Sequence, residues 1–182
     1  MVTSLEIFTK RLTLKIINQE HSHAFANRVA DSLSLHRWMD WCEPSFNVED
    51  AQEFIRANRL NWVKGTSYGF GVFCQKNQEF IGMVAITEVH LISNSASLGY
   101  WIADKHQQKG YAKEALNSII SFSFEKLQLT RIELVCDPEN VLSHKVALSC
   151  GCINEGINRN RFIYNGKPKD GLVFCVTPDL HI

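Results

Sequence analysis

Residues 107–112 have the composition and spacing of an anion-binding turn. Their sequence, Gln-Gln-Lys-Gly-Tyr-Ala, stands between an apolar stretch at residues 96–103 and a helix-like stretch at residues 109–127. The first amides of a helix lack intrahelical partners, and the helix dipole adds partial positive charge at that end. Gly110 has no Cβ, so the backbone there can approach a ligand closely. The pattern predicts that main-chain amides of this turn bind a phosphate or pyrophosphate group.

The motif in the turn narrows the type of phosphate ligand. The dinucleotide motif G-x-G-x-x-G and the P-loop motif G-x-x-x-x-G-K-[ST] are both absent from the sequence, and the turn reads Q-x-x-G-x-A instead. These six residues alone also fit an ordinary connection between a strand and a helix. The flanking sequence therefore has to decide between the two interpretations.

The flanks complete a pattern that resembles the GNAT acyltransferases, whose signature [Q/R]-x-x-G-x-[G/A] binds the pyrophosphate of acetyl-CoA. Leu-Gly-Tyr-Trp-Ile precedes the turn at residues 98–102, Asn-x-x-Ser follows at residues 140–143, and Ala-Leu-x-x-Gly follows at residues 147–151. Over residues 11–177 the chain looks like the branch that acetylates the N-termini of ribosomal proteins, the RimJ/RimL type.

The resemblance implies acetyl-CoA as the co-substrate. In the family the strand before the turn and the strand after the next helix splay apart, here residues 96–103 and 130–136, and pantetheine lies between them. A backbone N–H in that gap would polarise the thioester carbonyl as an oxyanion hole does. Asn140 matches a residue that bonds the pantetheine arm, although asparagine also serves as an ordinary helix N-cap. The expected cofactor-binding residues are Trp101, Ile102, Gln107, Gln108, Lys109, Gly110, Tyr111, Ala112 and Asn140.

The resemblance also implies a catalytic serine, and it shows one position at which this chain differs from the family pattern. Ser143 matches a serine that donates a hydrogen bond or a proton to the departing CoA thiolate; its alternative is an ordinary serine in a first helical turn. The family often has a glutamate that deprotonates the acceptor amine through water, and here Ser97 stands in its place. Glu88 and His90 are alternative bases, but a solvated strand end is the favoured interpretation of both.

An aromatic segment at residues 38–44 is the expected contact with the acceptor. In the family this segment lines the acceptor pocket, and clustered exposed aromatic side chains mark binding surfaces. An equally weighted alternative is that the tryptophans cap the core. The expected substrate-binding residues are Trp38, Trp41 and Ser97.

The missing glutamate bears on the kind of acceptor. The pKa of an α-amino group is about 7.8 and that of lysine about 10.4, so at pH 7 about 14% of the first and roughly 0.04% of the second is neutral. The difference corresponds to about 3.5 kcal/mol of deprotonation. A site without a glutamate base therefore favours an α-amine or another weakly basic amine.

Composition places these residues in a single globular domain, residues 1–182. The chain is 45% hydrophobic, and 19 Lys and Arg residues balance 19 Asp and Glu residues, so no basic excess favours nucleic acid. No apolar stretch reaches transmembrane length, and residues 1–6 lack the form of a signal peptide. Six cysteines without a C-x-x-C pair predict buried free thiols in a reducing cytoplasm, with no metal site. A redox or ligand pair at Cys150 and Cys152 is the disfavoured alternative.

The order of predicted elements is that of an α+β protein with the GNAT fold. We expect a mixed, mostly antiparallel sheet of about seven strands flanked by about four helices. The predicted strands cover residues 11–17, 68–75, 79–89, 96–103, 130–136, 152–162 and 170–177. The predicted helices cover residues 21–35, 47–63, 109–127 and 141–150.

Three functions remain open at this stage. The first is an N-acetyltransferase that moves acetyl from acetyl-CoA to a primary amine by direct attack, with the N-terminus of a ribosomal protein as the expected acceptor. The second is the same reaction on a small amine such as a polyamine, an amino acid or an antibiotic. The third is a non-catalytic acyl-CoA-binding module. The sequence leaves the oligomeric state open, a homodimer included.

Overall fold

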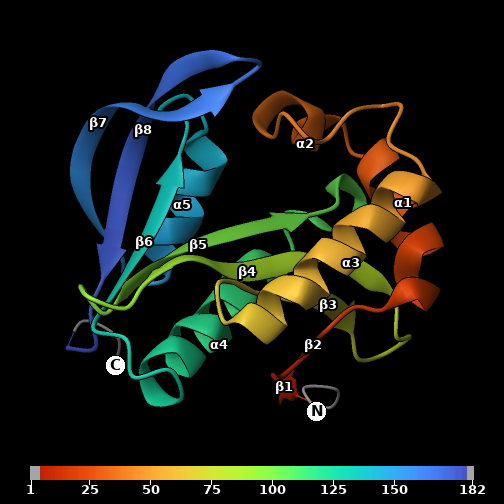
Figure 1. The fold of residues 1–182 in the computed structure, drawn as a ribbon, viewed down its shortest axis with the longest axis horizontal. Helices are drawn as coiled ribbons and strands as arrows, with labels where there is room; N and C mark the ends of the chain where they lie inside the picture. Colours follow the sequence, from red (N-terminus) through yellow and green to blue (C-terminus); the bar gives the residue numbers. More distant parts are fainter. Residues whose placement is uncertain (1–4, 180–182) are drawn as a thin grey trace.

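The computed structural model describes residues 5–179, in which eight strands form one sheet with helices on both faces (Figure 1). The strands are β1 (Glu6–Phe8), β2 (Leu12–Lys15), β3 (Tyr68–Cys74), β4 (Phe80–His90), β5 (Ser95–Ile102), β6 (Arg131–Cys136), β7 (Ile153–Tyr164) and β8 (Lys167–Val176). The helices are η1 (Gln19–His21), α1 (Ser22–Ala30), α2 (Leu33–Trp38), α3 (Val48–Lys64), η2 (Asp104–His106), α4 (Tyr111–Glu125) and α5 (Val141–Ser149). The strand order is β1-β2-β3-β4-β5-β6-β8-β7.

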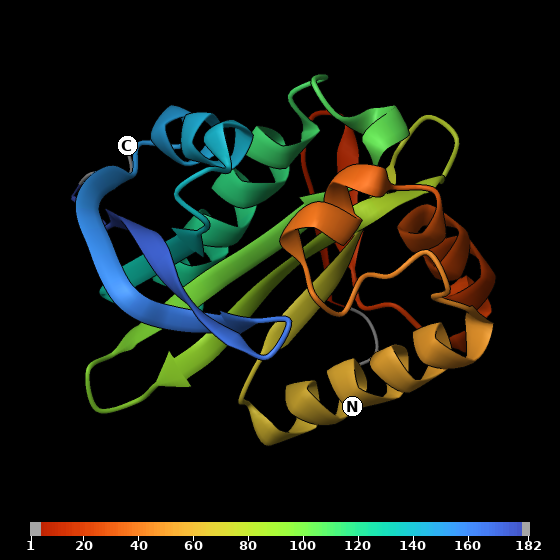
Figure 2. The same cartoon turned by 90° about the horizontal axis from the view of Figure 1, so that it is seen from above.

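The sheet is mixed and mostly antiparallel, as predicted, because β5 and β6 form the parallel pair in it. Figure 2 shows α1 and α3 on one face of the sheet and α4 and α5 on the opposite face. In β3, Phe70 belongs to the core that contains Ile119 of α4, whereas Phe73 belongs to the core that contains Phe25 of α1. Strands covered on both faces need apolar residues on both sides, which explains their nearly continuous apolar sequence.

The parallel pair opens part of the way along its length. β5 and β6 are paired only from Ser95 opposite Arg131 to Leu98 opposite Leu134. Beyond Leu98, β5 continues to Ile102 against β4, and β6 continues against β8. The two strands therefore splay apart in the middle of the sheet, as expected, and the backbone of residues 99–102 borders the gap.

The N-terminal half differs from the expectation of seven strands and four helices. β1 adds an eighth strand at the sheet edge, antiparallel to β2. The helix expected over residues 21–35 is interrupted, so that α1 and α2 are separate and five α-helices are described. At the break, Ser32 Oγ donates to the Arg28 carbonyl (2.6 Å) and accepts from the Asp104 amide (3.1 Å). Because Asp104 lies far along the chain, hydrophobic periodicity could not show this break.

Predicted turn and cap residues have their expected geometry. Asn47 Oδ1 accepts hydrogen bonds from the amides of Glu49 (2.8 Å) and Asp50 (3.3 Å) and so caps α3. Asn165 and Gly166 both have positive φ, 49° and 69°, and join β7 to β8. Both residues thus have the left-handed backbone that a two-residue hairpin turn requires, which confirms the predicted hairpin.

The structure bears on what composition predicted about membrane spans, metal sites and the cysteines. Among the described helices, none combines the length and apolar character that crossing a bilayer requires. Within residues 5–179, no three His, Cys, Asp or Glu side chains are grouped to hold a metal ion. All six cysteines are free; Cys42, Cys150, Cys152 and Cys175 are buried, and Cys74 and Cys136 are partly buried. Residues 1–4 belong to the N-terminal segment that lacks the form of a signal peptide, and they lie outside the described residues.

Candidate functional site

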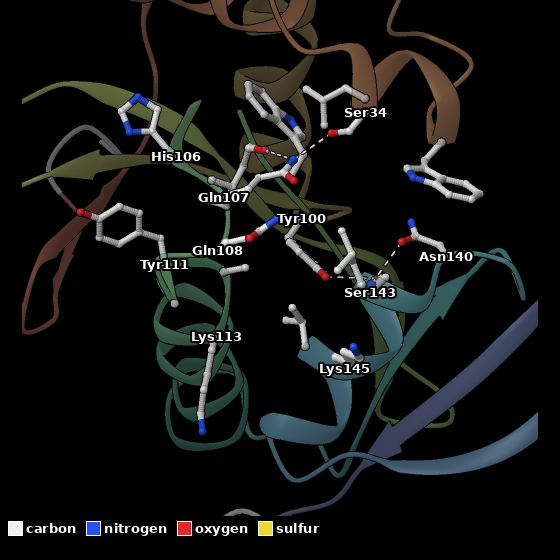
Figure 3. Close-up of a pocket in the computed structure, with 18 of the residues that line it drawn as sticks. Ser34, Tyr100, His106, Gln107, Gln108, Tyr111, Lys113, Asn140, Ser143 and Lys145 are labelled. Carbon is white, nitrogen blue, oxygen red and sulfur yellow. Dashed lines mark hydrogen bonds between the residues drawn. The ribbon is translucent and has the colours of Figure 1, made fainter. Parts of the chain in front are cut away.

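The predicted phosphate-binding turn connects η2 to α4. α4 begins at Tyr111, directly after Gly110, whose φ of 77° is left-handed, and Gln108 is also left-handed at 58°. The residues of the turn that line a cavity are Gln107, Gln108, Gly110, Tyr111 and Ala112 (Figure 3). Lys109 does not line this cavity, because its Nζ donates to the Lys105 carbonyl (2.9 Å). Its expected contact with the cofactor, through the main-chain amides of the turn, stays a prediction.

The Gln107 side chain ties the turn to the end of β5 and to α2. Its Nε2 lies within hydrogen-bond distance of Ser34 Oγ (2.8 Å), the Ile102 carbonyl (2.9 Å) and Asp104 Oδ1 (3.1 Å). The Ser34 amide also donates to Asp104 Oδ2 (3.1 Å). Gln107 thus holds the shape of the turn, and Ser34 is a cavity residue that the sequence did not single out.

Arg11 holds the same turn from the N-terminal segment. Its Nη1 donates to the Lys109 carbonyl (2.9 Å), its guanidinium lies 4.6 Å from the centre of the Tyr111 ring, and its Nε pairs with Glu114 (2.7 Å). Burial raises the pKa of Glu114, but hydrogen bonds from Thr9 and Arg11 outweigh burial and bring that pKa below its ordinary value. The start of α4 is therefore fixed by contacts that no local sequence pattern indicates.

The cavity beside the turn has a volume of about 360 Å³ and is lined by residues of α2, the end of β5, the turn itself, α4 and α5. Trp101 and Ile102 border it, and each is only 5% exposed. Lys113 of α4 and Lys145 of α5 line the cavity, and no Asp or Glu is among its described lining residues. Positive charge near a helix start suits the phosphate groups of CoA.

Tyr100 and Ser143 meet at the far end of this cavity. Tyr100 Oη lies 3.2 Å from Ser143 Oγ (Figure 3). Asn140 Oδ1 accepts from the Ser143 amide (3.1 Å), so Asn140 does serve as the N-cap of α5 while it also lines the cavity. Burial raises the pKa of Tyr100 to about 12, although its hydrogen bond to Ser143 acts in the opposite direction. Both hydroxyls are therefore protonated at neutral pH and available as hydrogen-bond donors.

A second cavity of about 330 Å³ begins at the same pair of hydroxyls. The residues that line both cavities are Trp38, Met39, Tyr100, Asn140 and Ser143. Glu88, Ser97 and Arg161 line only the second cavity. Ser97 Oγ and Arg161 Nη2 both donate to Glu88 Oε2, at 2.7 Å and 3.1 Å. Glu88 is therefore not simply a solvated strand end, as the sequence suggested, whereas His90 is exposed and lines neither cavity.

The two tryptophans of the aromatic segment have different positions. Trp38 lies at the junction of the cavities, where an acceptor would meet the acyl group. Trp41 lines neither cavity; its ring packs against Phe54 at 5.2 Å and Phe46 at 5.9 Å between ring centres. The structure places Trp41 in the cap over the core, so its expected contact with the acceptor is not supported by its position.

The arrangement suits acyl transfer between two substrates that occupy adjoining cavities. The first cavity carries two lysines and a helix start, and the second carries the carboxylates of Glu88 and Asp137 with one guanidinium. An anionic cofactor in the first and a cationic amine in the second would meet at the hydroxyls of Tyr100 and Ser143.

Comparison of this chain with known proteins identifies acetyltransferases both by sequence and by structure. The family model of the Acetyltransferase (GNAT) domain matches residues 11–153. A putative ribosomal-protein-serine acetyltransferase from Vibrio cholerae has a solved structure with 48% identity and a TM-score of 0.90, covering 98% of this chain and 100% of that chain. RimJ from Mycobacterium smegmatis, solved in complex with CoA-disulfide, has 27% identity and a TM-score of 0.83, covering 92% of this chain and 82% of that chain. The ribosomal-protein-serine acetyltransferase of Escherichia coli strain K12 is 28% identical over 122 residues, 67% of each chain.

The family match spans most of the chain, including the turn, the splayed strands and α5. We conclude that this chain belongs to the GNAT family of acetyltransferases, in its RimJ/RimL-type branch, and uses acetyl-CoA as co-substrate.

Proposed function

We propose that this chain transfers the acetyl group of acetyl-CoA to the N-terminal α-amine of a protein, with a ribosomal protein as the acceptor. The observation that carries the proposal is the pair of oppositely charged cavities that meet at Tyr100 and Ser143. The names of the relatives from Vibrio cholerae and Escherichia coli support ribosomal proteins as the acceptor class. Such acceptors would place the reaction in the cytoplasm, which suits six free thiols.

In the proposed site, the residues of the first cavity hold acetyl-CoA. The turn before α4 would receive the pyrophosphate, Lys113 and Lys145 would balance phosphate charge, and Asn140 would contact the pantetheine arm. When bound, acetyl-CoA supplies a thioester carbonyl that a neutral amine can attack. The C–N bond forms, the C–S bond breaks, the amine nitrogen gives up a proton to water, and the sulfur leaves as a thiolate.

Ser143 acts in this proposal as a hydrogen-bond donor toward the leaving sulfur. A thiol has a pKa of about 8.5, so a hydrogen bond is sufficient help and a strong acid is not needed. Tyr100, 3.2 Å from Ser143 Oγ, keeps the serine hydroxyl oriented. This assistance is worth most in the transition state, where charge develops on sulfur.

The test compares three amines at equal concentration with the purified chain and acetyl-CoA. The first is a peptide with a free serine N-terminus, the second is the same peptide blocked at its N-terminus and carrying an internal lysine, and the third is spermidine. Release of CoA thiol gives the rate, and mass spectrometry locates the acetyl group. We expect kcat/KM for the free N-terminus to exceed that for the lysine by at least about ten-fold, because less of the lysine is neutral.

Two results would reject parts of the proposal. Faster acetylation of the lysine or of spermidine would reject the α-amine as the acceptor class. Absence of thiol release with all amines, in a protein whose melting temperature rises with acetyl-CoA, would indicate a non-catalytic acyl-CoA-binding module.

A further inference from the structure

Glu88 lies on an irregular stretch of β4 that faces β5. Thr87 is opposite Ser97, but the next pair joins His90 to Ser95, so β4 contains one residue more than β5 between these pairs. Glu88 has a left-handed backbone with φ of 47°. This conformation is uncommon for a residue with a Cβ, and β-bulges often re-aim a side chain beside a functional site.

The Glu88 carboxylate is held by one of its two oxygens. Both the Ser97 hydroxyl and the Arg161 guanidinium donate to Oε2, so among the described residues Oε1 has no hydrogen-bond donor. The Glu88 side chain is 48% exposed, and it lines the second cavity together with Tyr100 and Ser143. Oε1 is therefore an oriented acceptor that an incoming ligand can reach.

The charges around Glu88 leave its carboxylate incompletely neutralised. Arg161 is shared, since its Nη2 also lies 3.9 Å from Glu133 Oε2. Asp137 adds a second carboxylate to the lining of the same cavity, and its Oδ2 is 4.0 Å from Lys169 Nζ. A cationic group that enters the second cavity would thus be attracted to Glu88.

We propose that Glu88 binds the ammonium group of the acceptor amine, and that Ser97 and Arg161 orient its carboxylate for this contact. The inference rests on the proposed function, because it assigns the acceptor contact of that reaction. It also gives Ser97 a role: the serine at the position of the family glutamate holds a carboxylate that comes from the neighbouring strand.

The carboxylate is a counter-ion rather than a proton acceptor. Hydrogen bonds from Ser97 and Arg161 lower the pKa of Glu88 below its ordinary value. Even an ordinary glutamate carboxyl has a pKa about 3.5 units below that of an α-ammonium group, so proton transfer from the acceptor to Glu88 is unfavourable by more than about a thousand-fold. The amine is therefore bound as the ammonium ion at Glu88 and loses its proton to water before it attacks.

The experiment measures KM for the free serine peptide and kcat separately in Glu88→Gln, which keeps the shape of the side chain and removes its charge. We expect KM to rise about 5- to 30-fold, between the effects of an exposed and a buried ion pair, with kcat within about three-fold of wild type. The Kd for acetyl-CoA should not change. Ser97→Ala keeps the charge of Glu88 and removes one of the two hydrogen bonds that orient its carboxylate. It should therefore raise KM by less than Glu88→Gln does. Glu49→Gln is the matched control, since Glu49 is an exposed carboxylate in the first turn of α3 and lines neither cavity.

The outcomes separate this inference from the function it rests on. An unchanged KM in a folded and active Glu88→Gln variant overturns the ammonium contact and leaves acetyl transfer intact. A large loss of kcat with an unchanged KM also overturns it, because Glu88 would then act on the proton. If wild type acetylates none of the amines, the proposed function fails, and the ammonium contact fails with it because it is a contact of that reaction.

Discussion

Ser143→Ala tests the reaction centre with little disturbance of the fold. The substitution removes the hydroxyl that lies 3.2 Å from Tyr100 Oη, while the Ser143 amide keeps its hydrogen bond to Asn140. Alanine also has a higher helix propensity than serine. The free energy of unfolding should therefore change by no more than about 1 kcal/mol, the net value of one neutral hydrogen bond.

The effect on the rate should be much larger than the effect on stability. A hydrogen bond to a group that becomes charged is worth about 1.5–3 kcal/mol, which corresponds to a decrease in kcat of about 10- to 150-fold. The Kd for acetyl-CoA should stay within about three-fold, because the contact gains its strength as charge develops on sulfur. Tyr100→Phe removes only a neutral partner of Ser143 and should lower kcat by about 2- to 10-fold. In the double variant the loss of kcat, expressed as a free energy, should be smaller than the sum of the losses in the two single variants, since the two hydroxyls are in contact.

The assay is single-turnover acetylation of the serine peptide with acetyl-CoA bound in advance, so that product release does not mask the chemical step. Ser118→Ala is the matched control, because Ser118 is a helix serine whose Oγ donates to the Ala115 carbonyl and which lines neither cavity. A single-turnover rate in Ser143→Ala equal to that of wild type would refute the role of the hydroxyl. A loss that appears in the Kd for acetyl-CoA instead would make Ser143 a binding residue only.

Two further predictions concern the turn and its support. Gly110→Ala should reduce the rise in melting temperature on addition of acetyl-CoA, and Gly110→Val should reduce it further, because φ of 77° costs a residue with a Cβ about 1–2 kcal/mol; an unchanged rise would make the turn an ordinary connection. Glu114→Gln should destabilise the protein at neutral pH, and the difference from wild type should shrink as pH falls. The native pKa of Glu114 is below its unfolded value of about 4.3, so its contribution is present above about pH 4.3 and is lost as pH falls through the native pKa. Denaturant unfolding at about pH 7, 5 and 3 measures this, and a difference that persists undiminished at about pH 3 would contradict it.

The features that could be read from the sequence are those set by neighbouring residues. Apolar stretches identified the central strands, because a strand buried on both faces needs apolar side chains on both sides. Gly110 was identified as the turn before a helix, and its left-handed backbone is what glycine permits most easily. Ser143 was identified by the resemblance of the segment Asn-x-x-Ser at residues 140–143 to the GNAT family, and the contact between Asn140 and Ser143 is local to the first turn of α5.

Only the tertiary structure decided which residues come together to line the two cavities. Tyr100 meets Ser143 across the gap between β5 and α5, and Arg11 reaches the Lys109 carbonyl from 98 residues away in the chain. Glu88 joins Ser97 because of a β-bulge in β4. Such contacts follow from strand register, from a bulge and from the order of strands in the sheet. Local periodicity reports only which side of its own element a residue occupies, so it cannot show which residues from distant elements meet there.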